Sequence, residues 1–192
     1  MTVALSSTAV SHYVLDKGAS RFTLRAFAGG MLSAMGHNPT IAIRDFSGEV
    51  EFNPAEPQKG TLHLQIRADS LEVMDDIKSA DRKEMENTMK QQVLQTAQFP
   101  DITFDATVAS ANQLGEGRFH VSLNGMLSLR GATGRAPVTA QVTLLGDMLR
   151  ASGEFSLLQT DYGIPLVSVA GGALKLKDEL KFTFDIVARK QE

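Results

Sequence analysis

Apolar and polar residues alternate strictly through much of this chain, and this alternation constrains the fold more than any other feature. Across residues 119–129 most odd positions are apolar, whereas even positions such as His120 and Ser128 are polar. Successive side chains of a β-strand point to opposite faces, so a period of two predicts strands with one buried face. The same period recurs at residues 22–24, 62–66, 102–108, 138–144, 149–157 and 180–187.

Turn signals separate the alternating runs. Gly115 and Gly117 divide two of them, and Gly146-Asp147 between two others is typical of a tight hairpin. Gly125-Met126 interrupts one run, which predicts a bend or bulge at a barrel corner. About eight strands at hairpin spacing favour an all-β sandwich or barrel. Closure into a barrel would also remove exposed strand edges.

One stretch, residues 80–95, is charged and rich in Met, and contains neither Gly nor Pro. Three of its apolar positions have i, i+4, i+8 spacing and share one face of an α-helix; they are Met85, Met89 and Val93. Asp81 and Glu84 resemble a capping box, with Ser79 as a competing start. Pro100 ends the element. We therefore predict an antiparallel barrel with one inserted helix at about residues 80–95.

Composition excludes several classes of function. The chain has 192 residues, which suits one domain, and we expect an extension at residues 1–12 and a barrel at 13–190. A net charge of −3 and the absence of Cys argue against a nucleic-acid partner and thiolate metal sites. No apolar run approaches the ~20 residues of a transmembrane segment. No signal peptide is visible, which predicts a cytoplasmic protein, or a periplasmic one if the native start is missing.

Reactive side chains show no catalytic or metal-binding pattern. His12 falls in the expected unstructured start, while His63 and His120 occupy the polar phase of their strands. His37, in Gly36-His37-Asn38-Pro39, lies in an expected turn. It either contacts a ligand at the barrel mouth or only caps the turn. No histidine pair has metal-ligand spacing. We therefore expect no enzyme, no metal and no cofactor.

The inward face of the expected barrel carries several small residues, namely Ala106, Gly125, Ala140, Ala151 and Gly153. Small inward residues leave space, and an apolar space lacks the polar partners that hold water. Such a space suits an apolar ligand. The alternative is a solid core in which these residues face tight turns or the helix.

Several segments, taken in order, resemble the YceI-like family of polyisoprenoid-binding barrels. They are YVLD at 13–16, SRFTL at 20–24, DFSGEVEF at 45–52, FPDITF at 99–104, NGMLSLRG at 124–131, QTDYGI at 159–164 and DELKF at 178–182. The resemblance implies an eight-stranded antiparallel lipocalin-like barrel, a covering helical insertion and an elongated apolar channel. It also implies that homodimers are common.

From this resemblance we expect a protein that carries or sequesters an isoprenoid quinone or polyprenyl lipid. The apolar tail is expected along inward residues Phe22, Leu24, Ile43, Phe104, Phe119, Val121, Leu123, Phe155, Phe182 and Phe184. The head group is expected at the mouth, at His37, Asn38 and Tyr162. The alternative is a structural or interaction module with a packed core and no ligand. An isomerase or hydratase would need a buried carboxylate or histidine facing the cavity.

Overall fold

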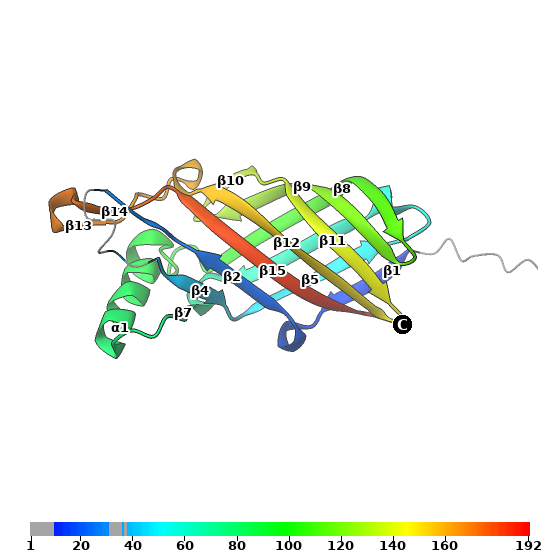
Figure 1. Ribbon diagram of the computed structural model, residues 1–192, viewed down its shortest axis with the longest axis horizontal. Helices are drawn as coiled ribbons and strands as arrows, with labels where there is room; N and C mark the ends of the chain where they lie inside the picture. Colours follow the sequence, from blue (N-terminus) through cyan, green and yellow to red (C-terminus); the bar gives the residue numbers. More distant parts are fainter. Residues whose placement is uncertain (1–9, 31–35, 37) are drawn as a thin grey trace, which may run out of the picture.

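The protein is a closed eight-stranded antiparallel β-barrel with one α-helix at one end, which confirms the predicted fold (Figure 1). A computed structural model describes residues 10–30, 36 and 38–192. In ring order the barrel strands are β1 (Ser11–Leu15), β5 (Phe46–Phe52), β6 (Thr61–Arg67), β8 (Asp101–Gly115), β9 (Arg118–Leu129), β11 (Val138–Leu145), β12 (Met148–Leu158) and β15 (Glu179–Lys190). Pairing of β15 with β1 closes the ring.

Several barrel strands continue past a break. The continuing segments are β2 (Arg21–Arg25), β4 (Thr40–Ile43), β7 (Leu71–Val73) and β10 (Ala132–Arg135). β15 pairs with β1 and then with β2, β2 pairs with β4, and β4 pairs with β7. β10 and β11 pair with β9 in one register and are interrupted at Pro137, which lacks an N–H. The segments beyond the breaks therefore extend the sheet at one end of the barrel, and the ring stays closed.

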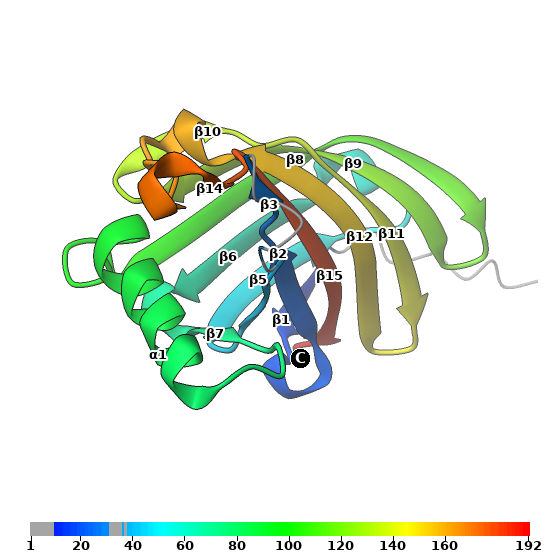
Figure 2. The same ribbon diagram turned by 60° about the vertical axis from the view of Figure 1, so that its left-hand side comes forward.

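Short helical turns occupy most of the remaining connections. The 3-10 helices are η1 (Lys17–Ala19), η3 (Pro57–Lys59), η4 (Ala68–Ser70), η6 (Gln159–Tyr162) and η7 (Ala170–Gly172). A small separate sheet is formed by β13 (Ser168–Val169), β14 (Leu174–Leu176) and β3 (Ala28–Gly29). Figure 2 shows β3 and β14 at the end of the barrel that also carries α1 (Ser79–Thr88).

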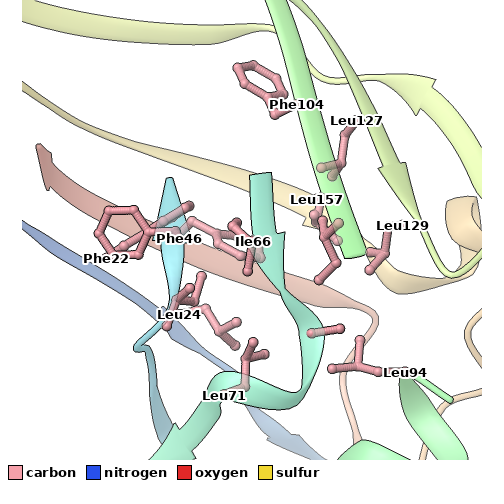
Figure 3. Close-up of a cluster of buried hydrophobic side chains, with 14 of the residues drawn as sticks. Phe22, Leu24, Phe46, Ile66, Leu71, Leu94, Phe104, Leu127, Leu129 and Leu157 are labelled. Atoms are coloured by element: carbon pink, nitrogen blue, oxygen red, sulfur yellow. The ribbon is translucent and has the colours of Figure 1, made fainter. Parts of the chain in front are cut away.

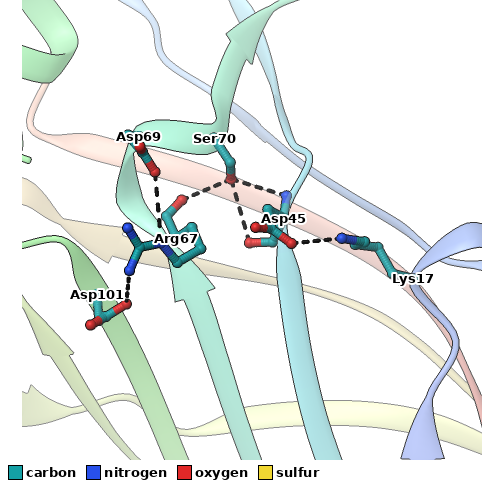
Figure 4. A network of polar contacts seen from close by, with 6 residues as sticks. All are labelled: Lys17, Asp45, Arg67, Asp69, Ser70 and Asp101. Carbon is teal, nitrogen blue, oxygen red and sulfur yellow. Dashed lines mark hydrogen bonds and ion pairs between the residues drawn. The ribbon is translucent and has the colours of Figure 1, made fainter.

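A polar network joins the broken strands (Figure 4). The Ser70 hydroxyl donates to the Arg67 carbonyl oxygen at 2.7 Å and accepts from the Asp45 N–H at 3.0 Å. Lys17 pairs with Asp45 at 2.6 Å, and Arg67 with Asp101 at 3.0 Å. These exposed ion pairs add little free energy individually. The serine contacts satisfy backbone groups that the broken ladder leaves unpaired.

Two-residue turns connect three strand pairs. Leu145 pairs with Met148, so Gly146-Asp147 is the predicted hairpin turn, and Gly146 has φ +58°. The φ > 0 requirement of such turns explains the glycine. In the β9–β10 hairpin Arg130 also has a positive φ, which its side chain gives no reason to expect.

The strand forms no bulge at Gly125, so this form of the prediction is wrong. Gly125 continues the inward alternation of β9 and pairs in register with Ala106. A Cβ at Gly125 would lie 2.1 Å from Phe104 Cε2, so the glycine makes room for a phenylalanine ring. The register shifts of this strand pair lie instead in β8, between Val108 and Ser110 and between Gln113 and Gly115.

The inserted helix matches the expected residues closely, because α1 continues as a π-helical turn at Met89–Val93. Met89 is buried, and Met85 and Val93 pack beside it, as the spacing predicts. The predicted capping box is wrong, because Lys78 is the N-cap and makes no side-chain capping bond. Tertiary contacts hold the helix instead: Glu86 Oε1 accepts from the Val73 N–H at 3.0 Å.

Two histidines on the outer face have carboxylate neighbours. His12 belongs to β1 and lies 3.8 Å from Glu49, so the expected unstructured start at this residue is wrong. His63 is exposed and lies 2.6 Å from Asp105, as expected of the polar phase of its strand.

Candidate ligand cavity

The barrel encloses an apolar cavity of about 630 Å³. Its wall includes residues from every strand of the ring. Along β12 it extends from Leu149 to Leu157, which at ~3.3 Å per residue and a ~40° tilt is on the order of 20 Å along the barrel. This volume lies within the ~300–1,000 Å³ typical of small-molecule sites. The shape is that of an elongated channel.

All but one of the residues expected to contact a tail line this cavity. They are Phe22, Leu24, Ile43, Phe104, Val121, Leu123, Phe155, Phe182 and Phe184. The period of two places them on the inner face, and Figure 3 shows several of them converging from different strands. Phe155 and Phe182 stack with centroids 4.7 Å apart, so aromatic faces form one side of the channel.

Phe119 points inward but does not line the cavity. Its side chain is 2% exposed, and its ring packs edge-on against Phe52 with centroids 5.4 Å apart. The pair belongs to a compact cluster with Tyr13, Val142 and Leu149 at the end away from α1. Phe119 is enclosed by this cluster, whereas Phe52, Val142 and Leu149 also line the cavity. The alternation predicted that this side chain points inward. It did not show whether the side chain lines the cavity or is enclosed in packed core.

The small inward residues have two different roles. Ala140 and Ala151 line the cavity, as the sequence suggested. Gly125 and Gly153 leave no empty space, because phenylalanine rings occupy it: a Cβ at Gly153 would lie 2.8 Å from Phe184 Cζ. Ala106 is buried without lining the cavity. The glycines therefore shape the wall by placing its aromatic rings.

The mouth differs from the sequence expectation. Asn38 is outside the cavity wall, and its Oδ1 accepts from the Ala28 N–H at 2.7 Å. Tyr162 is buried in the core beside Gly134, also outside the wall, and desolvation raises the pKa of its hydroxyl. His37 lies outside the described residues. Neither described residue is placed to meet a ligand in the cavity.

Other polar residues border the cavity instead. Asp81, Glu84 and Thr88 belong to α1, whereas Gln159 belongs to η6 and Lys175 to β14. Glu51 of β5 and Thr61 of β6 border the cavity as well. Polar residues in the helical stretch were visible in the sequence, but their position over the channel depends on how α1 docks. Gln159 and Lys175 had no local signal that could have identified them.

Charged pairs elsewhere lie on the outer surface. Arg150 donates two hydrogen bonds to Asp185, at 2.7 and 2.6 Å, and this pairing lowers the pKa of the Asp185 carboxyl. Within the described part of the chain, no cluster of three or more His, Asp or Glu is arranged to hold a metal ion. Across the same residues, no helix is long and apolar enough to cross a membrane.

The structure thus belongs to the class of closed antiparallel barrels with an elongated apolar cavity. A family model described as the YceI-like domain matches residues 13–188, and the chain belongs to this family. The family that the sequence segments resembled is therefore confirmed.

Solved structures show the same fold at low identity. BcnA of Burkholderia cenocepacia is 18% identical, with TM-score 0.68 and coverage of 90% of this chain and 98% of that one. A polyisoprenoid-binding domain from Saccharophagus degradans, implicated in plant cell wall breakdown, is 15% identical, with TM-score 0.66 and coverage of 93% and 98%. The Campylobacter jejuni YceI protein is 15% identical, with TM-score 0.57 and coverage of 79% and 85%. No curated protein sequence matches the chain.

Proposed function

We propose that the protein binds a long-chain apolar amphiphile, of the isoprenoid quinone or polyprenyl lipid class, inside the barrel. The observation that carries this proposal is the elongated cavity of about 630 Å³ with an almost wholly apolar wall. An apolar cavity offers few hydrogen-bond partners that could hold ordered water. A hydrocarbon chain fills such a cavity favourably. The polyisoprenoid-binding domain among the structural neighbours supports the same ligand class.

The energetics favour a ligand with a long tail. Burial of one methylene contributes about 0.8 kcal/mol. A tail of roughly twenty buried carbons therefore contributes about 16 kcal/mol, more than the ~4–15 kcal/mol cost of association. Micromolar binding, about 8 kcal/mol net, follows when that cost is about 8 kcal/mol. The cavity favours binding over catalysis, because the charged residues on its wall are all exposed; they are Glu51, Asp81, Glu84 and Lys175.

Native mass spectrometry of the purified protein tests the proposal directly. We expect a co-purifying apolar ligand, or uptake of an added polyprenyl compound at one molecule per barrel. Protein that is repeatedly ligand-free and takes up no prenyl compound would contradict it.

A substitution that fills the cavity gives a second test. Ala151 on β12 faces the cavity and is half-buried, so Ala151→Phe extends a ring into the channel. We expect at least a tenfold loss of affinity with the barrel still folded, as judged by circular dichroism. Gln141→Phe, on the exposed outer face of neighbouring β11, is the matched control and leaves binding intact.

A further inference from the structure

Gln159 is a buried polar residue in the wall of an otherwise apolar channel. It is the first residue of η6, directly after β12, and is 2% exposed. The wall around it includes Leu157, Ile164 and Leu176. Buried polar side chains are normally fully hydrogen-bonded, so an incompletely bonded one requires an explanation.

The amide of Gln159 is held in one orientation. Its Nε2 donates to the Lys177 carbonyl oxygen at 2.9 Å, and its backbone N–H donates to the Asp178 carbonyl oxygen at 3.0 Å. An amide nitrogen that donates to a carbonyl fixes which side of the group is oxygen. Among the described residues, none donates a hydrogen bond to Gln159 Oε1.

The turn that carries Gln159 is also fixed. Asp178 accepts from the Thr160 N–H at 2.9 Å and from the Thr160 hydroxyl at 2.6 Å. These bonds lower the pKa of the Asp178 carboxyl, so the anchor is charged at neutral pH. The Gln159 oxygen is therefore a preorganised acceptor, which loses little entropy when a donor reaches it.

We propose that Gln159 Oε1 accepts a hydrogen bond from a hydroxyl group of the bound amphiphile and so selects neutral alcohols over ethers and hydrocarbons. This inference rests on the proposed function and specifies the head group at the same site. A hydroxyl satisfies the acceptor, whereas an ether or carbonyl oxygen placed there faces it with another acceptor. A hydroxyl can also accept a hydrogen bond from the Lys175 ammonium, which borders the same end of the cavity.

The test compares geranylgeraniol with its methyl ether, by competition against a fluorescent apolar probe bound in the cavity. The two compounds share one tail and differ in the donor. We expect the wild-type protein to bind the alcohol about threefold to tenfold more tightly, as one net hydrogen bond provides. In Gln159→Met we expect this preference to disappear while the affinity for the ether is kept.

Gln141→Met, on the outer face of β11, is the matched control and keeps the full preference. Equal wild-type binding of alcohol and ether overturns the role of Gln159 and leaves the proposed function intact. Failure of both compounds to bind overturns the proposed function and this inference together. If Gln159→Met does not fold, the comparison of the two compounds on the wild-type protein still decides the point.

Discussion

Gly125 on β9 shows how a missing side chain shapes the cavity, and Gly125→Ala is the sharpest test of that packing. The added Cβ would lie 2.1 Å from Phe104 Cε2 and 2.5 Å from the Ala136 carbonyl oxygen. We expect the displaced ring to move into the cavity, whose wall it already forms. The carbonyl belongs to the neighbouring strand segment, which is bonded to Gly125 through the Ala136 N–H at 2.9 Å.

The expected destabilisation is large for a single methyl group. Overpacking a well-filled core costs about 1–3 kcal/mol, and we expect the upper part of that range because one obstacle is backbone. At roughly 2–4 °C per kcal/mol for a domain of this size, about 2–3 kcal/mol lowers the Tm by about 4–12 °C. Thermal and urea unfolding followed by circular dichroism measure both quantities. Ligand affinity falls as well, because the displaced Phe104 ring takes up cavity volume.

Gly18→Ala is the matched control, because the nearest atom to its added Cβ is Asp16 Oδ1 at 3.5 Å. We expect its free energy of unfolding to stay within about 0.5 kcal/mol of wild type. In the double variant with Phe104→Leu, the smaller side chain relieves part of the clash, so the two effects do not add. A Tm of Gly125→Ala within 1 °C of wild type would refute the reasoning (~0.5 kcal/mol at most).

Two further predictions concern stability. Phe119→Ala opens a hole in the packed cluster at the end of the barrel away from α1, and we expect it to cost about 3–5 kcal/mol. Phe155→Ala, whose half-buried ring borders the cavity, is expected to cost only about 1–2 kcal/mol for the lost stack on Phe182. Equal losses in urea unfolding would argue against an open channel. Hydrogen bonds from Thr160 lower the pKa of the Asp178 carboxyl in the folded protein. The carboxylate therefore stabilises the fold at pH values above about 3.9, its pKa in the unfolded chain. This stabilisation is lost as the pH falls through the lower pKa of the folded state. Asp178→Asn should therefore be less stable than wild type at pH 7, with the difference shrinking below about pH 4; a Tm difference independent of pH would count against this.

Local patterns predicted most of the fold because β-structure in this chain has a strong periodic signal. Alternation placed Phe22 and Phe182 on the inner face, and Gly146 marked its hairpin, because each depends on near neighbours in sequence. The helical face of Met85 and Met89 followed from spacing alone. The predicted capping box is wrong, because Lys78 is the N-cap; contacts such as the Glu86 bond to the Val73 N–H hold the helix on the barrel.

The alternation of apolar and polar residues is enough to assign each strand side chain to the inner or the outer face. What an inward side chain contacts depends on how the whole barrel packs. Phe119 meets Phe52 and is enclosed in packed core, whereas Phe155 borders open space, although both lie in the same phase of alternating strands. Gln159 gained its place in the wall through bonds to Lys177 and Asp178, far along the chain. The shape of the cavity depends on the distances across the barrel. Side chains from strands that are remote in sequence set these distances together, so no local pattern predicts them.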